Sequence, residues 1–280
     1  MTTISHLRRE LTNLLSSHEK ASYLLEDFLG MTTTQLIIEG DKNLSDETTE
    51  SLRSMARRIR NGEPLQYVTG RAYFAGEYYS VNPSVLIPRP ETSQLIEWVS
   101  QKLANHIAPS HILDIGTGSG IIAIELKKIF PAAHVVALDV SQLALDVASD
   151  NAKMIGVDIE FIKDDILNPC KLTKQYNFDL VVSNPPYVME GEKTYMELDV
   201  LNHEPHIALF VPDDDPLRFY VAITKLLSRI AKPTCSLFFE INEALSKEVV
   251  SMMVSEGLSD VECRDDFNGK PRMVYGLYSR

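Results

Sequence analysis

The sequence predicts an α/β protein with a seven-stranded, mostly parallel sheet, preceded by a small helical bundle and a β-hairpin linker. Apolar residues recur at helical spacing over residues 4–60, and short aromatic and β-branched pieces follow over 64–90. After Pro109, strand-like and helix-like segments alternate, which is typical of parallel strands joined by helices. We expect an N-terminal domain over residues 1–80, including the start of the hairpin, and a second domain over 81–280.

Four helices are expected in the N-terminal domain. Apolar residues at helical spacing define two helices before Gly30, which suits the C-terminal stop of the second. A short helix is expected over 34–39, and a fourth begins after Ser45, an N-capping residue type, and stops at Asn61-Gly62. Residues 1–80 hold nine Lys and Arg against eleven Asp and Glu, so we expect a solvated face rather than a nucleic-acid-binding stripe.

The stretch from Pro64 to Pro90 has the composition of a hairpin or linker. Its aromatic and β-branched pieces are 67–68, 73–74, 78–81 and 85–87. Glycines and prolines separate these pieces. A helix over 93–103 is expected to follow.

Seven strands are predicted in the second domain, with helices between them. The expected strands are 112–115, 134–138, 160–162, 178–182, 236–241, 261–264 and 273–278. The expected helices are 121–130, 144–155, 216–231 and 244–256. The last two strands flank the turn Asn268-Gly269, so we expect them to pair antiparallel at the edge of the sheet.

Composition excludes several classes of protein. The chain has 280 residues, is 44% hydrophobic and carries a net charge of −12, which opposes the phosphate attraction behind non-specific nucleic-acid binding. No apolar run reaches the length of a membrane helix and the first residues lack a signal-peptide core, so a cytoplasmic location is expected. The three cysteines are far apart and predict free thiols.

A glycine-rich loop from Asp114 to Gly120 joins the first strand of the sheet to its helix. Alternate glycines allow a tight turn and close approach of a ligand. The dinucleotide pattern would need glycine at Ile121, and no Gly-Lys-Ser/Thr of the phosphate-binding pattern follows. Neither a dinucleotide nor a nucleoside triphosphate is therefore favoured.

Acidic residues follow the next two strands. Asp139 ends the second strand, where a carboxylate can accept hydrogen bonds from both hydroxyls of a ribose, and Asp164 and Asp165 end the third, where an adenine would lie. A cofactor with ribose and adenine but no phosphate, contacted by acids, is S-adenosylmethionine. Helix capping and plain solvation are the alternatives for these aspartates.

Asn184-Pro185-Pro186-Tyr187 follows the fourth strand at the same edge of the sheet. The prolines lack N–H donors, so the turn offers acceptors, and an Asn oxygen beside a fixed carbonyl suits a substrate nitrogen with two N–H groups. Tyr187 would add a flat face. A simple turn is the structural alternative. The acceptor could be an amide or the exocyclic amine of a base, so an adenine-specific DNA methyltransferase, a guanine-specific rRNA methyltransferase and a non-catalytic binding module also stay open.

Two further stretches bear on partners. His203-Glu204-Pro205-His206 is one residue short of the H-E-x-x-H metal motif and contains proline, so no metal is predicted. Residues 190–215 hold eight acids and one lysine, Lys193. A solvated loop would explain this composition, and our hypothesis is an acidic rim that attracts a basic partner.

With the loop from Gly116 to Gly120, Asp139 and the Asn184 turn in this order, the chain resembles the class I S-adenosylmethionine-dependent methyltransferases, which have a Rossmann-like sheet. Within them it is most similar to the peptide chain release factor glutamine methyltransferases. The stretches that carry this likeness are 64–70, 85–92, Glu204-Pro205 and 269–276, and the likeness covers nearly the whole chain.

The resemblance implies a reaction and its residues. The enzyme would methylate the side-chain amide nitrogen of the glutamine in the Gly-Gly-Gln motif of class 1 peptide chain release factors, which supports translation termination, and would release S-adenosylhomocysteine. No stable nucleic-acid, membrane or metal partner is expected, and residues 1–80 would bind the protein partner. The implied cofactor contacts are Gly116, Thr117, Gly118, Ser119, Gly120, Asp139, Asp165, Ile166 and Asn184. The implied substrate contacts are Asn184, Pro185, Pro186 and Tyr187, of which Asn184, Pro185 and Tyr187 would act in catalysis.

Overall fold

The structure, a computed structural model, describes residues 2–104, 106–172 and 176–280. The chain forms two compact units, Met1–Arg71 with Glu197–His203, and Ala72–Met196 with Glu204–Arg280. These units differ from the expected division at residue 80 in where the hairpin falls. The assignment of 1–80 and 81–280 as functional domains stays a prediction.

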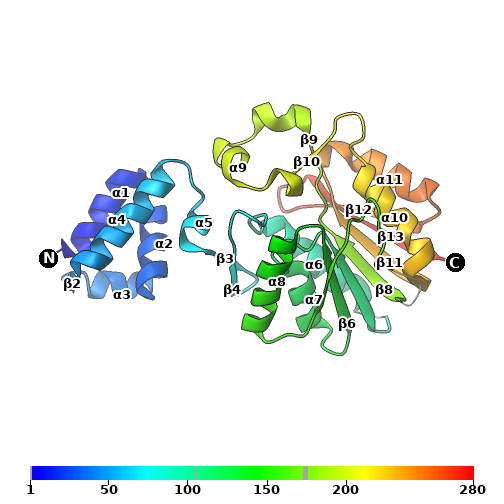
Figure 1. Cartoon of the computed structure of the whole chain (residues 1–280), viewed down its shortest axis with the longest axis horizontal. Coiled ribbons are helices and arrows are strands. Elements are labelled where there is room, and N and C mark those ends of the chain that lie inside the picture. The colour runs from blue at the N-terminus through cyan, green and yellow to red at the C-terminus, as the bar shows by residue number, and fades with distance from the viewer. Residues whose placement is uncertain (1, 105, 173–175) are drawn as a thin grey trace. The chain divides into compact units, whose positions relative to one another are not determined.

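The first unit is helical. Its elements are β1 (Thr2–Thr3), α1 (Ile4–Leu15), α2 (His18–Leu29), α3 (Thr33–Ile38), β2 (Asn43–Leu44), α4 (Asp46–Arg60), α5 (Leu65–Thr69) and α9 (Leu198–His203) (Figure 1). The predicted stop at Gly30 is confirmed, because this residue has φ 65° at the end of α2, and so is the N-cap Ser45, whose side chain accepts from the backbone N–H of Thr48. Leu7, Leu25 and Leu52 are fully buried in its core.

The hairpin is shorter than the sequence suggests. Only β3 (Arg71–Phe74) and β4 (Glu77–Ser80) form a two-stranded sheet. The β-branched piece 85–87 forms no strand: the segment is irregular, and the N–H of Ile87 donates to Oε2 of Glu204 at 3.2 Å. Prolines close on both sides of this segment remove ladder donors, which explains why its apolar side chains are buried without a sheet.

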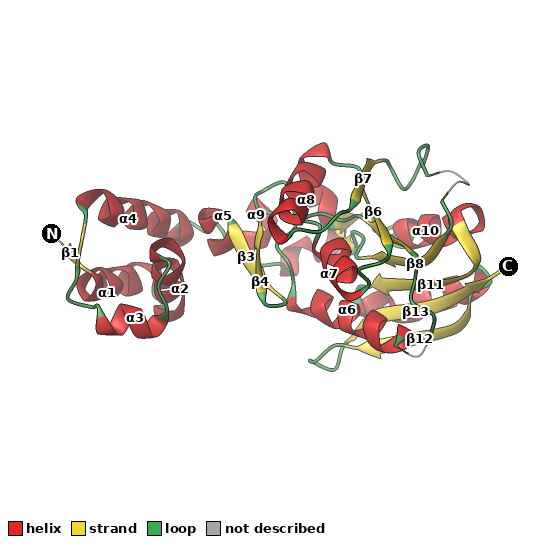
Figure 2. Ribbon diagram, turned by 90° about the horizontal axis from the view of Figure 1, so that it is seen from below, coloured by secondary structure: helices red, strands yellow, loops and turns green. Residues whose placement is uncertain are grey.

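The second unit contains the predicted seven-stranded sheet. Its strands lie in the order β12 (Ser259–Asp265), β13 (Pro271–Ser279), β11 (Ala231–Glu240), β8 (Phe178–Ser183), β5 (His111–Ile115), β6 (His134–Asp139) and β7 (Glu160–Lys163) (Figure 2). From β11 to β7 all neighbours are parallel, whereas β13 runs antiparallel to both β11 and β12. The predicted antiparallel pair at the sheet edge is therefore confirmed.

Both faces of the sheet are buried, as a parallel sheet requires. The helices of this unit are α6 (Pro90–Leu103), α7 (Ile121–Ile129), α8 (Gln142–Ile155), α10 (Arg218–Ile230) and α11 (Ser246–Ser255). Leu113 on β5 packs in one core with α10 and α11, and its neighbour Ile112 packs in the other with α6, α7 and α8. The period of two along the strand thus divides the side chains between two helical layers.

Between β8 and α10 the chain makes short elements that the sequence pattern did not indicate. They are β9 (Val188–Met189), the 3-10 helices Glu190–Tyr195 and His206–Ala208, and β10 (Phe210–Val211), which pairs parallel with β9. A further 3-10 turn, Glu243–Leu245, precedes α11. Pieces of two to six residues are too short to leave a periodic signal.

Candidate functional site

A cavity of about 300 Å³ lies at the carboxyl-terminal ends of β5, β6, β7 and β8. Its lining includes 84–86, 88–89 and Thr92, then 115–119, 138–141, 164–167, 183–186, and Ile207 with Ala208. Open α/β sheets bind ligands at this edge, and the volume is within the range of small-molecule sites. The cavity is therefore the candidate active site.

The glycine-rich loop forms one wall of the cavity. Gly116 and Gly118 have φ values of 73° and 55°, which favour glycine. The N–H groups of Gly116 and Thr117 donate to the carbonyl of Leu138 at 2.8 and 3.0 Å, and that of Gly118 donates to Asp139 at 2.9 Å. Because these donors are bonded within the protein, they are not available to a phosphate, which agrees with a cofactor that has none.

Gly120 differs from the other loop glycines. It is not among the lining residues, and its φ is 85°. A Cβ atom at this position would lie 2.9 Å from Cβ of Ala148 on α8. The packing of α7 against α8 therefore requires glycine here, and a cofactor contact at Gly120 stays a prediction.

Asp114 supports the glycine-rich loop from the protein interior and is completely buried. Its Oδ2 accepts the hydroxyl of Thr117 at 2.6 Å and the N–H of Ala123 at 3.2 Å. Burial raises the pKa of the Asp114 carboxyl to about 7, although the bonds from Thr117 and Ala123 oppose the shift. This carboxyl holds the loop to the first turn of α7.

Asp139 ends β6 with both carboxylate oxygens held by the backbone. Oδ2 accepts from Gly118 and Oδ1 accepts from the N–H of Ser141, each at 2.9 Å. Burial raises the pKa of Asp139, against hydrogen bonds from Ser141 and Gly118 that favour the charged form. A carboxylate has further lone pairs, so this fixed side chain can also accept from two hydroxyl groups in the cavity.

Asp164 and Asp165, the two aspartates after β7, differ in their surroundings. Asp164 is buried, and its Oδ2 accepts the N–H groups of Cys170 and Lys171 at 3.0 and 2.8 Å. Burial opposes its ionisation, but these N–H groups outweigh that effect and hold the pKa of Asp164 below its usual range. Asp165 and Ile166 line the cavity, with Asp165 Oδ1 accepting from the N–H of Leu167 at 2.9 Å.

The turn after β8 forms the opposite wall, where Asn184, Pro185 and Pro186 all line the cavity. The hydroxyl of Ser183 donates to the carbonyl of Ile115 at 2.7 Å, so the turn is held beside the end of β5. The amide nitrogen of Asn184 donates to Oγ1 of Thr92 at 3.4 Å, the remaining amide oxygen of Asn184 being an acceptor.

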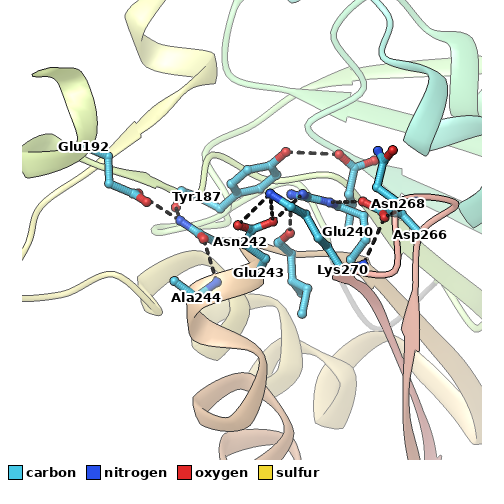
Figure 3. A network of polar contacts seen from close by, with 11 residues as sticks. Tyr187, Glu192, Glu240, Asn242, Glu243, Ala244, Asp266, Asn268 and Lys270 are labelled. Atoms are coloured by element: carbon cyan, nitrogen blue, oxygen red, sulfur yellow. Dashed lines mark hydrogen bonds and ion pairs between the residues drawn. The ribbon is translucent and has the colours of Figure 1, made fainter. Parts of the chain in front are cut away.

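Tyr187 was expected to offer a flat face to the substrate, but its side chain points to Glu240. It is not among the lining residues, and its hydroxyl donates to Oε1 of Glu240 at 3.2 Å (Figure 3). Burial and the charge of Glu240 raise the pKa of Tyr187. Its backbone carbonyl accepts from Nδ2 of Asn242 at 3.1 Å. The tyrosine thus anchors the end of the turn rather than facing the cavity.

Four residues near the site were not chosen from the sequence. Arg89 and Thr92 line the cavity, Glu204 is buried and ion-paired to Arg89 at 2.5 Å, and Glu240 is 1% exposed. Among the described residues of the lining, Arg89 is the one cation, and the other charged residues are aspartates. The sequence held one signal for Glu240: it is a charged residue inside the apolar run before Ile241. Acids are rarely buried without a partner, so an acid in a buried strand indicates a polar partner nearby.

Metals and membranes receive no support from the described structure. Within residues 2–104, 106–172 and 176–280, no group of three or more His, Cys, Asp or Glu side chains is placed to hold a metal ion. In the same ranges, the helices are too short or too polar for a membrane span.

The seven-stranded sheet, the glycine-rich loop after β5 and the fixed carboxylate after β6 define a class I S-adenosylmethionine-dependent methyltransferase. Residues 92–204 match the family model "Methyltransferase small domain", and residues 3–70 match "PrmC N-terminal domain". The chain belongs to the release factor glutamine methyltransferase family, because its identity to curated members is high over almost the whole length.

Two members illustrate the relationship. The release factor glutamine methyltransferase of Bacteroides thetaiotaomicron is 38% identical over 273 residues, which is 96% of this chain and 97% of the relative. That of Flavobacterium psychrophilum is 40% identical over 253 residues, 90% of this chain and 88% of the relative. Among solved structures, the T. thermophilus 16S rRNA N2 G1207 methyltransferase superimposes with a TM-score of 0.53 at 16% identity, covering 75% of this chain and 50% of that one, which shows a shared fold.

Proposed function

We propose that this protein methylates the side-chain amide nitrogen of the glutamine in the Gly-Gly-Gln motif of class 1 peptide chain release factors. The observation that carries the proposal is Asn184, which lines the cavity with its amide nitrogen already bonded to Thr92 and its amide oxygen left to accept. Membership of the release factor glutamine methyltransferase family supports glutamine as the acceptor.

The residues present fit S-adenosylmethionine. Asp139 would accept from the ribose hydroxyls, Asp165 and Ile166 would lie beside the adenine, and the loop from Gly116 to Ser119 would contact the methionine part. Arg89, the one cation among the described lining residues, would pair with the carboxylate of that part. When bound, S-adenosylmethionine supplies the methyl group, which it carries on a positively charged sulfur.

The turn would hold the acceptor. An amide nitrogen is a poor nucleophile because its lone pair is delocalised into the carbonyl. The oxygen of Asn184 and the carbonyl of Pro185 accept the two amide hydrogens, which fixes the nitrogen in the cavity and stabilises the positive charge that develops on it. One of these protons is then lost to water, which restores a neutral amide. Pro186 keeps the turn rigid, and Tyr187 keeps it in place.

The nucleic-acid alternatives have less support. Exocyclic amines of adenine or guanine also present two N–H groups, but the net charge of −12 opposes binding to a polyanion, and the curated relatives carry the release factor name. The fixed Asn184 also weighs against a binding module without catalysis. A cytoplasmic location is part of the proposal, because class 1 release factors act at the ribosome.

The test is methylation of purified class 1 release factor with methyl-labelled S-adenosylmethionine, followed by tandem mass spectrometry. We expect one methyl group on the glutamine of the Gly-Gly-Gln motif, and none on a release factor in which this glutamine is replaced by alanine. Duplex DNA and deproteinised rRNA are assayed in parallel. Label on either nucleic acid, with none on the release factor, would overturn the proposal.

A further inference from the structure

Glu240 has no place in the proposed chemistry, yet it is one of the most deeply buried acids of the second unit. It is the last residue of β11 and is 1% exposed. Its Oε2 accepts the hydroxyl of Thr92 at 2.7 Å, and its Oε1 accepts the hydroxyl of Tyr187 at 3.2 Å. A buried carboxylate is costly, so one that is retained with two hydroxyl partners beside a cavity calls for a role.

The hydrogen bond from Thr92 to Glu240 determines how Asn184 is oriented. An ionised carboxylate can only accept, so Thr92 uses its single hydroxyl hydrogen on Glu240. The lone pairs of Thr92 Oγ1 are then left to accept from Nδ2 of Asn184, which lies 3.4 Å away. The nitrogen end of the Asn184 amide is thereby assigned to Thr92, and the oxygen end is the one left for a ligand.

If the hydrogen bond between Thr92 and Glu240 ran in the opposite direction, Asn184 could no longer accept from the substrate. If Glu240 were a neutral acid, it could donate to Thr92, and Thr92 could donate in turn to an Asn184 amide turned by 180°. Asn184 would then present N–H donors to a substrate amide that also presents donors. The charge of Glu240 therefore decides whether Asn184 is an acceptor.

Glu240 and its neighbours also hold the far end of the turn. The Tyr187 hydroxyl is on Glu240, and the Tyr187 carbonyl is on Nδ2 of Asn242, which also donates to Oε2 of Glu192 at 2.9 Å (Figure 3). The Asn242 Oδ1 accepts from Ala244 at 3.0 Å, so its own orientation is fixed. Both ends of the Asn184–Tyr187 turn are tied to the end of β11.

The groups around Glu240 have opposing effects on its pKa. Burial raises the pKa of Glu240 above its ordinary value, and Glu91 adds to the rise, while the hydroxyls of Thr92 and Tyr187 and the charge of Arg272 oppose it and favour the ionised form. The phenol of Tyr220, which also faces Glu240, donates to its backbone carbonyl at 3.3 Å and not to the carboxylate.

Two acids and a backbone carbonyl hold Arg272, whose charge acts on Glu240. Its Nε lies 3.3 Å from Oδ2 of the buried Asp266, and its Nη1 donates to the carbonyl of Ile241 at 3.3 Å. Nη2 lies 3.3 Å from Glu243. This gives a use to the stretch 269–276, whose likeness to the family the proposed chemistry leaves unexplained: it supplies the cation that favours an ionised Glu240.

We propose that Glu240 is a positioning residue which, through Thr92, fixes the Asn184 amide with its oxygen toward the acceptor glutamine. The inference rests on the proposed function, since it concerns the orientation of the acceptor clamp. It makes Thr92 a relay whose hydroxyl, and not its methyl group, is needed.

The test compares matched variants. Thr92→Val keeps the volume and removes the hydroxyl, and we expect kcat for release factor methylation to fall at least about tenfold. Thr92→Ser keeps the hydroxyl, and we expect kcat within about threefold of the wild type. Calorimetric titration should give an S-adenosylhomocysteine Kd within about threefold for both, because a lost orientation of Asn184 affects the acceptor. Equal kcat in the valine and serine variants, or a loss of cofactor affinity as large as the loss of kcat, would overturn the proposal.

A second variant keeps the test decisive if Thr92→Val fails to fold. Glu240→Gln can keep its carbonyl oxygen on Thr92 and does not titrate, whereas Glu240, once protonated, gains an O–H that can donate to Thr92 and reverse the bond. We expect the wild-type kcat to decline toward acidic pH and the decline to be absent in Glu240→Gln. An unchanged acid limb in this variant would contradict the role of Glu240. Failure of the wild type to methylate any release factor would instead refute the proposed function, so the two failures are distinguishable.

Discussion

The hydroxyl of Tyr187 lies 3.2 Å from Oε1 of Glu240 and donates to it, although 53 residues of chain separate the two. The bond joins the last residue of the acceptor turn to the buried end of β11. It places the tyrosine outside the cavity lining and makes its hydroxyl a structural group.

Tyr187→Phe should therefore destabilise the protein more than it affects the cofactor. Loss of a hydrogen bond to a charged group costs about 1.5–3 kcal/mol, so the melting temperature should drop by several degrees. S-adenosylhomocysteine affinity should be unchanged in titration calorimetry. Tyr73→Phe is the matched control, because its side chain is 60% exposed. If Tyr187→Phe abolished methyl transfer at unchanged stability, a direct chemical role of the hydroxyl would replace the structural one.

Asn184→Ala should separate transfer from cofactor binding. The variant loses one of the two acceptors for the glutamine amide, so kcat should fall about 100-fold or more, as for other preorganised hydrogen-bonding groups. Cofactor affinity, measured by titration calorimetry, should change only a few fold, because the loop, Asp139 and Ile166 remain. Asn268→Ala, in an exposed turn, serves as control and should retain wild-type kcat. Parallel losses in both measurements would restrict Asn184 to the cofactor.

The sequence was sufficient for the sheet and for the side chains at its carboxyl edge. Gly116, Asp139 and Asn184 each follow a periodic apolar strand, and parallel strands bring such residues together without further information. Contacts between elements far apart in the sequence could not be predicted from local patterns. Glu240 depends on Thr92, 148 residues away, and nothing in local periodicity indicates which hydroxyl a buried acid will meet.

The piece 85–87, in the stretch of hairpin or linker composition, shows a related limit of local sequence patterns. Val85 and Ile87 are buried and β-branched, which favours a strand, but their partners are a carboxylate and neighbouring loops rather than a ladder. Propensity describes a side chain that fits a pleated surface and does not report whether a neighbouring strand is present. Tyr187 was misplaced for the same reason, since an aromatic after a turn can face a ligand or a buried acid.

Gly120→Ala should cost more stability than Gly156→Ala. Both glycines have positive φ, at 85° and 81°, so each alanine pays about 1 kcal/mol for the left-handed backbone. Only at Gly120 would the new methyl group also meet Ala148, whereas Gly156 has open space. Overpacking adds about 1–3 kcal/mol. Equal shifts of the melting temperature in the two variants would show that the α7–α8 contact tolerates the methyl group.

Asp114 should make stability depend on pH. Burial raises the pKa of its carboxyl from 3.8 to about 7, so between these values the folded state holds a proton that the unfolded state releases. Its contribution is fully present below pH 3.8 and is lost as pH rises toward 7, a change on the order of 4 kcal/mol.

Asp114→Asn removes this titration while keeping an oxygen for Thr117 and Ala123. The melting temperature of the variant minus that of the wild type should rise as pH increases from about 4 to about 8. Asp150→Asn is the control, because its side chain is 73% exposed, and its difference from the wild type should stay flat. A flat difference for Asp114→Asn would mean that the carboxyl is ionised throughout.

The acidic rim should make methylation of an intact release factor sensitive to salt. Glu190 and the run from Asp213 to Asp215 are exposed, and Asp213 is held beside the 3-10 helix by the N–H of Gly191 at 2.9 Å. If this surface attracts a basic partner, kcat/KM should fall about tenfold between about 50 and 300 mM salt, while kcat stays constant. Replacing Asp213, Asp214 and Asp215 by Asn should lower kcat/KM at low salt and flatten its salt dependence. A neutral Gly-Gly-Gln peptide is the control substrate and should show little salt dependence. Rates with the intact factor that do not respond to ionic strength would leave the rim as a solvated loop.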